Sequence, residues 1–408
     1  MAGRRKDNKN RVLRTGESQR SDGNYQYRWT TQDKKRHYVY APTLKELREK
    51  EDEIQRDLVD GIRFDLQRLT LSDYFTIWFD LKNGIKESSE RHYIYLFERY
   101  IKPDLGDRKI RDIKKSEICR FYNHLAYDRN LNASSLDGVN LVLRQIFSLA
   151  VDDSIIRVNP CNGVLKGLKK ELGTPDKRRA LTTSQQRRFL NFLKNDKQYR
   201  HWLPIFSTML GTGMRVGEVT GLQWQDIDFE KNVINVTHTL VYLPPFNGKK
   251  GCLVLQSPKS KAGIRTIPLL SSVKDALLQV KRDQNLDGIK CKVTISGFTD
   301  FVFLTRSGKL YHKTTLNRAI SRIVRDMNNA GASDVDLMPH FSCHTLRHTF
   351  TTRLIESGMN PKIVQNVLGH SDIQTTLNIY ADVTDQFKQE SFIRIDDFFK
   401  DEKSIIHQ

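Results

Sequence analysis

The sequence predicts a multidomain α+β protein in which helices predominate. Its 408 residues are enough for two or three domains with their own cores. Strand-like alternation is confined to residues 25–40 and to short stretches between 233 and 304, whereas helical apolar periodicity covers most of the rest. We expect a small N-terminal three-stranded sheet with one helix, then a helical bundle, then a mainly helical domain with a small antiparallel sheet. The expected segments are 1–65, 66–165, a basic linker over 166–179, 180–395, and a C-terminal tail over 396–408.

The chain carries a large positive charge. It has 67 Lys and Arg against 48 Asp and Glu, a formal net charge of +19, which favours a polyanionic partner. We find no apolar run of about 18 residues and no apolar stretch after the charged N-terminus, so neither a membrane span nor a secretion signal is expected. The five cysteines are scattered without a CxxC pair, which argues against a disulfide framework or a zinc site. Nucleic acid is therefore the leading partner.

Residues 11–62 are expected to form a miniature domain, preceded by a flexible basic arm over the first ten residues. Tyr25, Tyr27 and Trp29 alternate with polar residues, and residues 37–40 alternate again after a polar turn, which predicts an antiparallel sheet. Thr43 and Glu46 then stand at the spacing of a helix capping box. The helix that follows carries one apolar face, formed by Leu44, Leu47, Ile54 and Leu58.

Basic residues are concentrated in this N-terminal part, where residues 1–40 hold eleven Lys and Arg against four Asp and Glu. Because a β-ribbon fits the DNA major groove, Arg, Lys and Tyr side chains on the outer face of the sheet are candidate DNA contacts. The alternative is a solvated basic face without a ligand. The basic candidates are Arg14, Arg20, Arg28, Lys34 and Lys35.

Residues 69–165 are expected to form a compact bundle of four or five helices. Aromatic and aliphatic side chains recur at helical spacing as far as Asn159–Pro160, where helix propagation stops. Such stripes indicate core packing rather than a cofactor site. The basic stretch 166–179 that follows contains Lys177, Arg178 and Arg179 and predicts an exposed linker, which either follows a phosphate backbone or is a solvated connector.

The third domain begins near Leu181. Helical patterns extend to about residue 221, and helices return from Ser272, apart from a short extended piece at 301–304. Strands are expected at Val233–Val236, Leu253–Ser257 and Arg265–Pro268.

Four polar patterns stand out in this domain. A glycine-rich turn leads into a helix that carries Arg215 and Glu218 three residues apart, on one face. A polar segment from Pro258 to Arg265, expected to be a hairpin tip between two strands, holds Lys259 and Lys261. The other two patterns are His344-Thr-Leu-Arg347-His348, with His344 and Arg347 on one helical face, and Leu-Gly-His370, followed ten residues later by Tyr380.

Taken singly, each of these residues would be read as a surface charge, a core tyrosine or a satisfied polar group. Their order resembles that of the tyrosine recombinases, also called phage-type integrases. The resemblance covers about residues 175–390 and rests on Thr-Gly-Met-Arg-Val-Gly-Glu, His-Thr-Leu-Arg-His-Thr and Leu-Gly-His-Ser followed by Tyr. The helical second domain resembles the family's core-site-binding domain. The first domain resembles the arm-site-binding domain of integrases from Gram-positive conjugative transposons.

The resemblance implies a site-specific recombinase that cleaves and rejoins DNA through a 3′-phosphotyrosyl intermediate to excise and integrate a mobile element. Tyr380 would be the nucleophile, and Arg215 and Arg347 would bind the phosphate oxygens. His344 would act as general base, His370 would donate to a phosphate oxygen, and Lys259, or alternatively Lys261, would protonate the leaving 5′-oxygen. Glu218 and His348 are expected to support these groups, without metal, cofactor or ATP.

The resemblance also implies partners. These are double-stranded DNA at core and arm sites, three further copies of the chain in a tetramer on DNA, a small excisionase and a host DNA-bending protein. We expect a bacterial, cytoplasmic, nucleoid-associated protein. A cellular recombinase that resolves chromosome dimers, a type IB topoisomerase and a DNA-binding regulator that does not cut are the alternatives. The apolar residues after Tyr380 would cap their own domain or dock on a neighbouring subunit.

Overall fold

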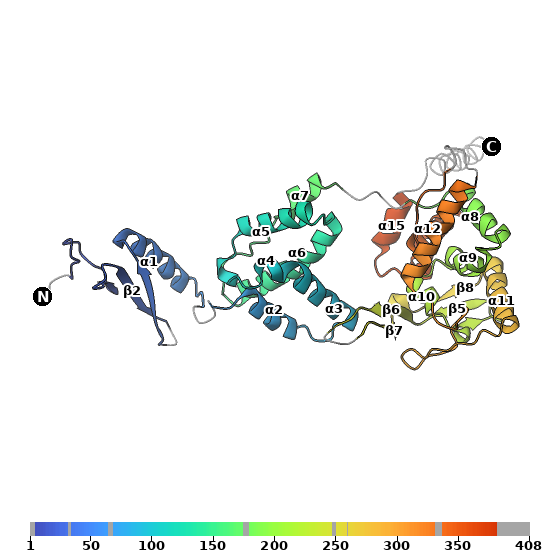
Figure 1. Ribbon diagram of the computed structural model, residues 1–408, viewed down its shortest axis with the longest axis horizontal. Helices are drawn as coiled ribbons and strands as arrows, with labels where there is room; N and C mark the ends of the chain where they lie inside the picture. The colour runs from blue at the N-terminus through green and yellow to red at the C-terminus, as the bar shows by residue number, and fades with distance from the viewer. Residues whose placement is uncertain are drawn as a thin grey trace, which may run out of the picture. The chain divides into compact units, whose positions relative to one another are not determined.

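The computed structural model describes residues 5–31, 34–63, 68–173, 179–246, 250–258, 260–330 and 337–381. The chain divides into two compact units, Met1–Pro175 and Asp176–Gln408 (Figure 1). Each unit has its own hydrophobic core. The apolar residues expected in the C-terminal tail lie outside the described ranges. The predicted fold class, mostly helical with small sheets at the N-terminus and in the second unit, is confirmed.

The first unit begins with a three-stranded antiparallel sheet that packs on one helix. The strands are β1 (Glu17–Gln19), β2 (Tyr25–Thr30) and β3 (Arg36–Ala41), in that order across the sheet, and the helix is α1 (Leu44–Val59). Alternation along β2 turns Tyr25 and Tyr27 toward α1, where both are buried against its apolar face. The predicted N-cap is present, because Thr43 Oγ1 accepts the Glu46 N–H at 3.2 Å.

The rest of the first unit is a helical bundle, as predicted. Its core is a single cluster of aromatic and aliphatic side chains contributed by nearly every helix. The helical segments are α2 (Leu71–Asp80), α3 (Glu87–Leu96), η1 (Phe97–Ile101), α4 (Lys102–Leu105), η2 (Ile110–Asp112), α5 (Lys115–Asn123), η3 (His124–Asp128), α6 (Ala133–Asp152) and α7 (Leu165–Glu171).

Helix α7 corrects one expectation. The linker expected over 166–179 begins later than predicted, because residues 165–171 are helical and Leu165 and Leu168 are buried in the bundle core. These two leucines lie three residues apart and so share a helical face. Two apolar positions among lysines and a glycine are too short a pattern to predict a helix.

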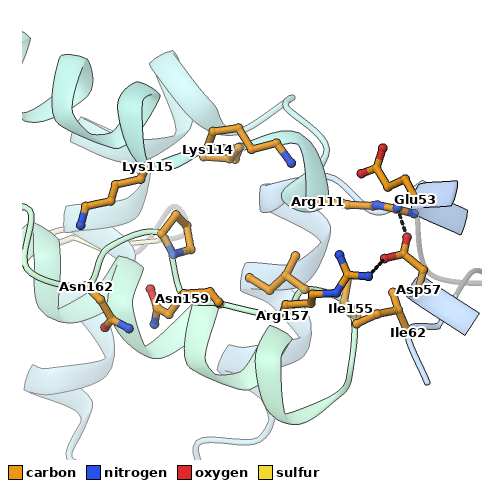
Figure 2. A pocket seen from close by; sticks show the side chains of 14 residues that line it. Glu53, Asp57, Ile62, Arg111, Lys114, Lys115, Ile155, Arg157, Asn159 and Asn162 are labelled. Carbon is orange, nitrogen blue, oxygen red and sulfur yellow. Dashed lines mark hydrogen bonds and ion pairs between the residues drawn. The ribbon is translucent and has the colours of Figure 1, made fainter. Parts of the chain in front are cut away.

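Buried ion pairs join α1 to the bundle beside a pocket of about 310 Å³. Asp57, near the end of α1, is buried and forms ion pairs with Arg111 and with Arg157, the latter at 2.6 Å. Arg157 also pairs with Asp60 at 2.6 Å. Figure 2 shows both guanidinium groups turned toward Asp57, with Lys114 on the bundle side of the pocket. A buried carboxylate with two arginine partners is costly to break, because removing it leaves charge without compensation.

The second unit surrounds helix α9, which packs against α11 and α13. Its core gathers side chains from these helices, from α12 and from the central strands. The helical segments are α8 (Thr183–Asn195), η4 (Arg200–Trp202), α9 (Leu203–Thr212), α10 (Val216–Thr220), η5 (Trp224–Asp226), η6 (Lys261–Gly263), α11 (Ser271–Leu286), α12 (Lys313–Asn329), α13 (Cys343–Glu356), α14 (Pro361–Leu368) and α15 (Ile373–Ala381).

The second unit contains two small sheets rather than one. Strands β4 (Ile227–Asp228), β5 (Val233–Val236) and β8 (Arg265–Pro268) form the first, and β6 (Thr239–Leu243) pairs with β7 (Cys252–Gln256) in a separate hairpin. Figure 1 shows that hairpin beside α10. The prediction that Pro258–Arg265 forms a hairpin tip is wrong. β7 pairs with β6 and β8 pairs with β5, so this segment connects the two sheets. No helix among the described residues is long and apolar enough to span a bilayer.

We expect Asp57→Asn to loosen the end of α1 from the bundle. Native-state hydrogen exchange measured by mass spectrometry should accelerate on the order of tenfold in the last turn of α1 and at the Arg63 N–H, which donates to Ser154 O at 2.8 Å. Asp60→Asn is the matched control, because Asp60 is half-exposed and also pairs with Arg157, so its effect should be smaller. Equal, unaccelerated exchange in both variants would contradict a stabilising role for Asp57.

Candidate active site

The predicted polar residues begin at a tight turn between α9 and α10. Gly213 ends α9 with a φ of +60°, and a Cβ atom there would overlap the Phe350 ring. Glycine is needed on both counts. The turn places Arg215 directly before α10, where its backbone N–H donates to the Glu218 carboxylate at 2.7 Å.

Glu218 is buried between two arginines. It accepts a hydrogen bond from Arg215 Nη1 at 2.9 Å and two from the guanidinium of Arg265, at 2.8 and 3.2 Å. Burial alone would raise the pKa of Glu218, but the hydrogen bonds and charges of Arg265 and Arg215 outweigh it and lower this pKa below its usual range. The carboxylate therefore stays ionised and fixes both guanidinium groups.

Arg347 lies in the interior, on α13. Its Nη1 donates to Gly213 O at 2.7 Å and its Nη2 to Leu368 O at 2.8 Å. Burial, followed by the nearby charge of Arg215, lowers the pKa of Arg347 to about 9. Arg347 therefore remains a cation at pH 7, but one that gains from an anion beside it.

The C-terminal end of α14 is where the arginines meet. Helix C-termini expose carbonyls without intrahelical partners and carry partial negative charge, so cations are favoured there. Arg215 has a side chain 43% exposed, so it reaches both this end and solvent. Three successive carbonyls accept from three arginines: Val367 O from Arg265 Nε at 2.7 Å, Leu368 O from Arg347 Nη2 at 2.8 Å, and Gly369 O from Arg215 Nη2 at 3.3 Å.

His370 follows this end directly and is buried. Its Nδ1 lies 2.9 Å from Thr376 Oγ1. Its backbone N–H donates to Gln365 O at 3.1 Å, and its carbonyl accepts from the Gln365 side-chain amide at 3.0 Å. Burial, then the charges of Arg347 and Arg215, lower the pKa of His370 to about 4. The imidazole is therefore neutral at pH 7.

Tyr380 lies on α15, which packs against α13 and α14. Its side chain is half-buried, burial raises the pKa of its phenol, and its hydroxyl donates to Met359 O at 2.5 Å. His344 lies on the exposed face of α13 one turn before Arg347, and His348 is half-buried on the same helix. The structure thus brings Arg215, Arg347 and His370 together at the end of α14. The phenol of Tyr380 is hydrogen-bonded to the main-chain carbonyl of Met359.

The two candidate lysines lie in the segment between β7 and β8. Lys261 is exposed on η6, and Lys259 lies outside the described residues. Gly263, in the same segment, contacts one of the arginines: its carbonyl accepts a hydrogen bond from Arg265 Nη1 at 3.1 Å.

The sequence motifs did not predict Arg265 as a site residue. Its side chain is buried, with 5% of its surface exposed. A signal was present in the sequence. Arg265 stands two residues before the buried Ile267 on the same strand, so its side chain points into the protein, where a charged group needs partners.

The N-terminal DNA-contact candidates divide into two groups. Arg28 lies on the outer face of the sheet opposite Tyr38, and the Arg20 guanidinium lies 5.2 Å from the ring of Tyr40, which is exposed on the same face. Lys34 and Lys35 are exposed at the β2–β3 turn. Arg14 instead lies beside α1, within 3.5 Å of Glu51 and 3.4 Å of Asp52. Arg179 is exposed, and Lys177 and Arg178 lie outside the described residues.

Side chains that could bind a metal do not cluster near these arginines. Within the ranges that the structure describes, no group of three or more His, Cys, Asp or Glu side chains is arranged to hold a metal ion.

Family models match three parts of the chain. The model described as the phage integrase family matches residues 179–386, the DNA-binding domain of Tn916 integrase matches residues 1–58, and the phage integrase N-terminal SAM-like domain matches residues 70–126.

Related proteins match over almost the whole length. The transposase of transposon Tn1545 from Streptococcus agalactiae is 31% identical over 94% of this chain and 95% of that protein. The transposase of Tn916 from Enterococcus faecalis is 30% identical over the same shares. The Tn1549 transposon integrase, solved with transposon right-end DNA, matches 80% of this chain and 99% of its own with 27% identity and a TM-score of 0.69. The same integrase was solved with circular intermediate DNA.

The environment of His370 gives a direct titration test. In the free protein we expect its imidazole NMR signals to stay in the neutral position from pH 8 to 5, with a midpoint near 4. Since unfolding restores the usual value near 6.5, the neutral histidine contributes stability above that pH, which is lost as the pH falls toward 4. His370→Asn assigns the resonance, and a midpoint near 6.5 would show that neither burial nor the arginines lower the pKa of this group.

Proposed function

The chain belongs to the phage integrase family, the tyrosine recombinases, and on that premise we propose that it excises and integrates a mobile DNA element by site-specific recombination. The relatives that match over nearly the whole chain are transposases of Tn1545 and Tn916, and the related Tn1549 integrase was solved on transposon-end and circular-intermediate DNA. The observation that carries the proposal is the convergence of Arg215, Arg347 and His370 at the end of α14.

Arg215 and Arg347 bind the non-bridging oxygens of the scissile phosphate. Each uses part of its five N–H donors on carbonyls or on Glu218, and the others are left for an anion. A phosphate dianion-like transition state in this place would offset the repulsion between two fixed cations, and a guanidinium binds phosphate bidentately. Glu218 supports this role by orienting Arg215.

Tyr380 supplies the nucleophile. Its phenolic oxygen attacks phosphorus, a tyrosyl–phosphate bond forms at the 3′ side, and the bond to the 5′-oxygen breaks. His344 accepts the phenolic proton, and Lys259 gives a proton to the departing 5′-oxygen; Lys261 is the alternative donor. Rejoining reverses these transfers, with one phosphate ester formed for each one broken, so the reaction requires no ATP. The fixed arginine cations stabilise the transition-state charge without a metal. To react, the phenol first leaves Met359 O.

His370 acts as a neutral hydrogen-bond donor. When its Nδ1 accepts from the Thr376 hydroxyl, 2.9 Å away, the ring proton resides on Nε2. That proton is then available to a phosphate oxygen. His348 contributes to the packing of α13 rather than to chemistry.

The N-terminal part recognises DNA outside the cleavage site. We assign residues 1–65 to arm-site binding, 66–165 to core-site binding, 166–179 to the connection and 180–395 to catalysis. The outer face of the sheet, with Arg28, Tyr38 and Tyr40, carries basic and aromatic side chains suited to the major groove. Arg20, Lys34 and Lys35 would contact phosphates at its rim, and Lys177, Arg178 and Arg179 those near the core site.

Recombination joins two duplexes, so the working form is a homotetramer on DNA. An excisionase and a host DNA-bending protein would set the direction of the reaction. The reaction takes place on DNA in the bacterial cytoplasm.

The first test is a covalent adduct on nicked DNA that carries the element ends, with EDTA present and ATP absent. We expect the chain to become linked to a 3′-phosphate through Tyr380, and Tyr380→Phe to bind the same DNA but form no adduct. Peptide mapping identifies the residue. Tight binding without any adduct by the unsubstituted chain would instead favour a DNA-binding regulator.

The second test distinguishes the two lysines. A substrate with sulfur in place of the 5′-bridging oxygen releases a thiolate, which leaves without a proton. We expect Lys259→Ala to lose about 10²- to 10⁴-fold in cleavage rate on ordinary DNA and to recover on the sulfur substrate. Lys261→Ala should cleave both substrates as the unsubstituted chain does. Rescue of Lys261→Ala instead would move the acid role to that residue.

A further inference from the structure

We propose that Arg265 is a positioning residue that holds the phosphate-binding arginine Arg215 and His370 in register without touching DNA itself. This inference deepens the proposed function and rests on it. The sequence pattern that carries the two lysines ends at Arg265 but gives this residue no role; the contacts of its guanidinium assign one.

The guanidinium of Arg265 makes four hydrogen bonds to protein groups. Its Nε donates to Val367 O at 2.7 Å, its Nη1 to Gly263 O at 3.1 Å and to Glu218 Oε1 at 3.2 Å, and its Nη2 to Glu218 Oε2 at 2.8 Å. These bonds occupy four of its five N–H donors, whereas Arg347, which is as deeply buried, makes two such bonds and keeps more donors for a phosphate. Arg215 shares the same carboxylate and is 43% exposed.

These contacts join three segments that are distant in sequence. Glu218 belongs to α10 and fixes Arg215, Gly263 belongs to the segment with the two candidate lysines, and Val367 lies three residues before His370. One rigid, planar cation therefore sets the spacing between the groups that must surround one phosphate. Errors of about 1 Å in such spacing cost on the order of a hundredfold in rate.

Close packing leaves no room for adjustment at this junction. Gly369 has a φ of +66°, and a Cβ atom there would lie 2.6 Å from Ala262 O and 3.0 Å from Arg265 Cδ. The end of α14 is thus in close contact with Arg265. A lysine at position 265 has no planar fork and could not donate to Val367, Gly263 and Glu218 at once.

Arg265 also balances charge. It shares the Glu218 carboxylate with Arg215, so without it Glu218 would draw both Nη groups of Arg215 toward itself and away from a phosphate. Its positive charge is, after burial and the charges of Arg347 and Arg215, one of the causes that lower the pKa of His370. Loss of the Arg265 charge should therefore raise that pKa, whereas a substitution that keeps the charge should not.

The test uses the full chain with Arg265→Gln, which removes the charge, and Arg265→Lys, which keeps the charge but not the fork. We measure single-turnover adduct formation, DNA affinity and the His370 NMR midpoint. We expect both variants to lose ten- to hundredfold in cleavage rate while DNA affinity changes less than about threefold, and only Arg265→Gln to raise the His370 midpoint.

Arg353→Gln is the matched control. Arg353 also pairs with a carboxylate, Glu356, and donates to a main-chain carbonyl, Leu181 O, in the same unit, but it makes none of the contacts at the end of α14. It should keep the cleavage rate and the His370 midpoint. If it matched Arg265→Gln in both, general destabilisation would explain the loss and the proposal would be wrong.

A double variant, Glu218→Gln with Arg265→Gln, removes both charges of this pair together. If Arg265 acts through Glu218, the losses of the single variants will not add. Additive losses, unchanged cleavage in Arg265→Gln, or an affinity loss as large as the rate loss would each overturn the positioning role. Adduct formation by the unsubstituted chain in the same assay establishes the proposed function separately.

Discussion

Three arginines anchored on three successive carbonyls at the end of α14 are the interaction on which the catalytic unit depends. Arg265, Arg347 and Arg215 come from a strand, from α13 and from the turn before α10, and none of these segments is adjacent in sequence. The carbonyls at the helix end accept hydrogen bonds from cations that would otherwise be costly to bury. The arginines in turn supply donors to carbonyls that have no partner within the helix. Among the described residues, one carboxylate, that of Glu218, is hydrogen-bonded to these arginines, so net positive charge remains for a phosphate.

The fold was predictable where its signals are local. The alternation of Tyr25 and Tyr27, the N-cap at Thr43 and the aromatic stripes of the bundle follow from sequence periodicity, and all appear in the structure. Pairing between strands is not local. β6 follows β5 without a turn signal, so the division into two sheets was missed, and with it the true course of the segment that carries the lysines.

The site was predictable where residues belong to short motifs with a fixed spacing, as Arg215, Arg347 and His370 do. Arg265 could not be assigned in this way, because its partners lie 47 and 102 residues away and only the folded chain brings them together. The same holds for Thr376, which orients His370 from α15. Motifs therefore identify the groups that meet substrate, whereas the groups that position them depend on tertiary contacts.

The most direct test of this account is cleavage of DNA whose scissile phosphate is replaced by an uncharged methylphosphonate. If Arg215 and Arg347 stabilise charge on the non-bridging oxygens, removing that charge should largely restore cleavage by Arg215→Ala and Arg347→Ala relative to the unsubstituted chain. Tyr380→Phe should gain nothing, because its defect is the missing nucleophile. Equal defects of the arginine variants on both substrates would contradict the account and assign these arginines to the architecture of the fold alone.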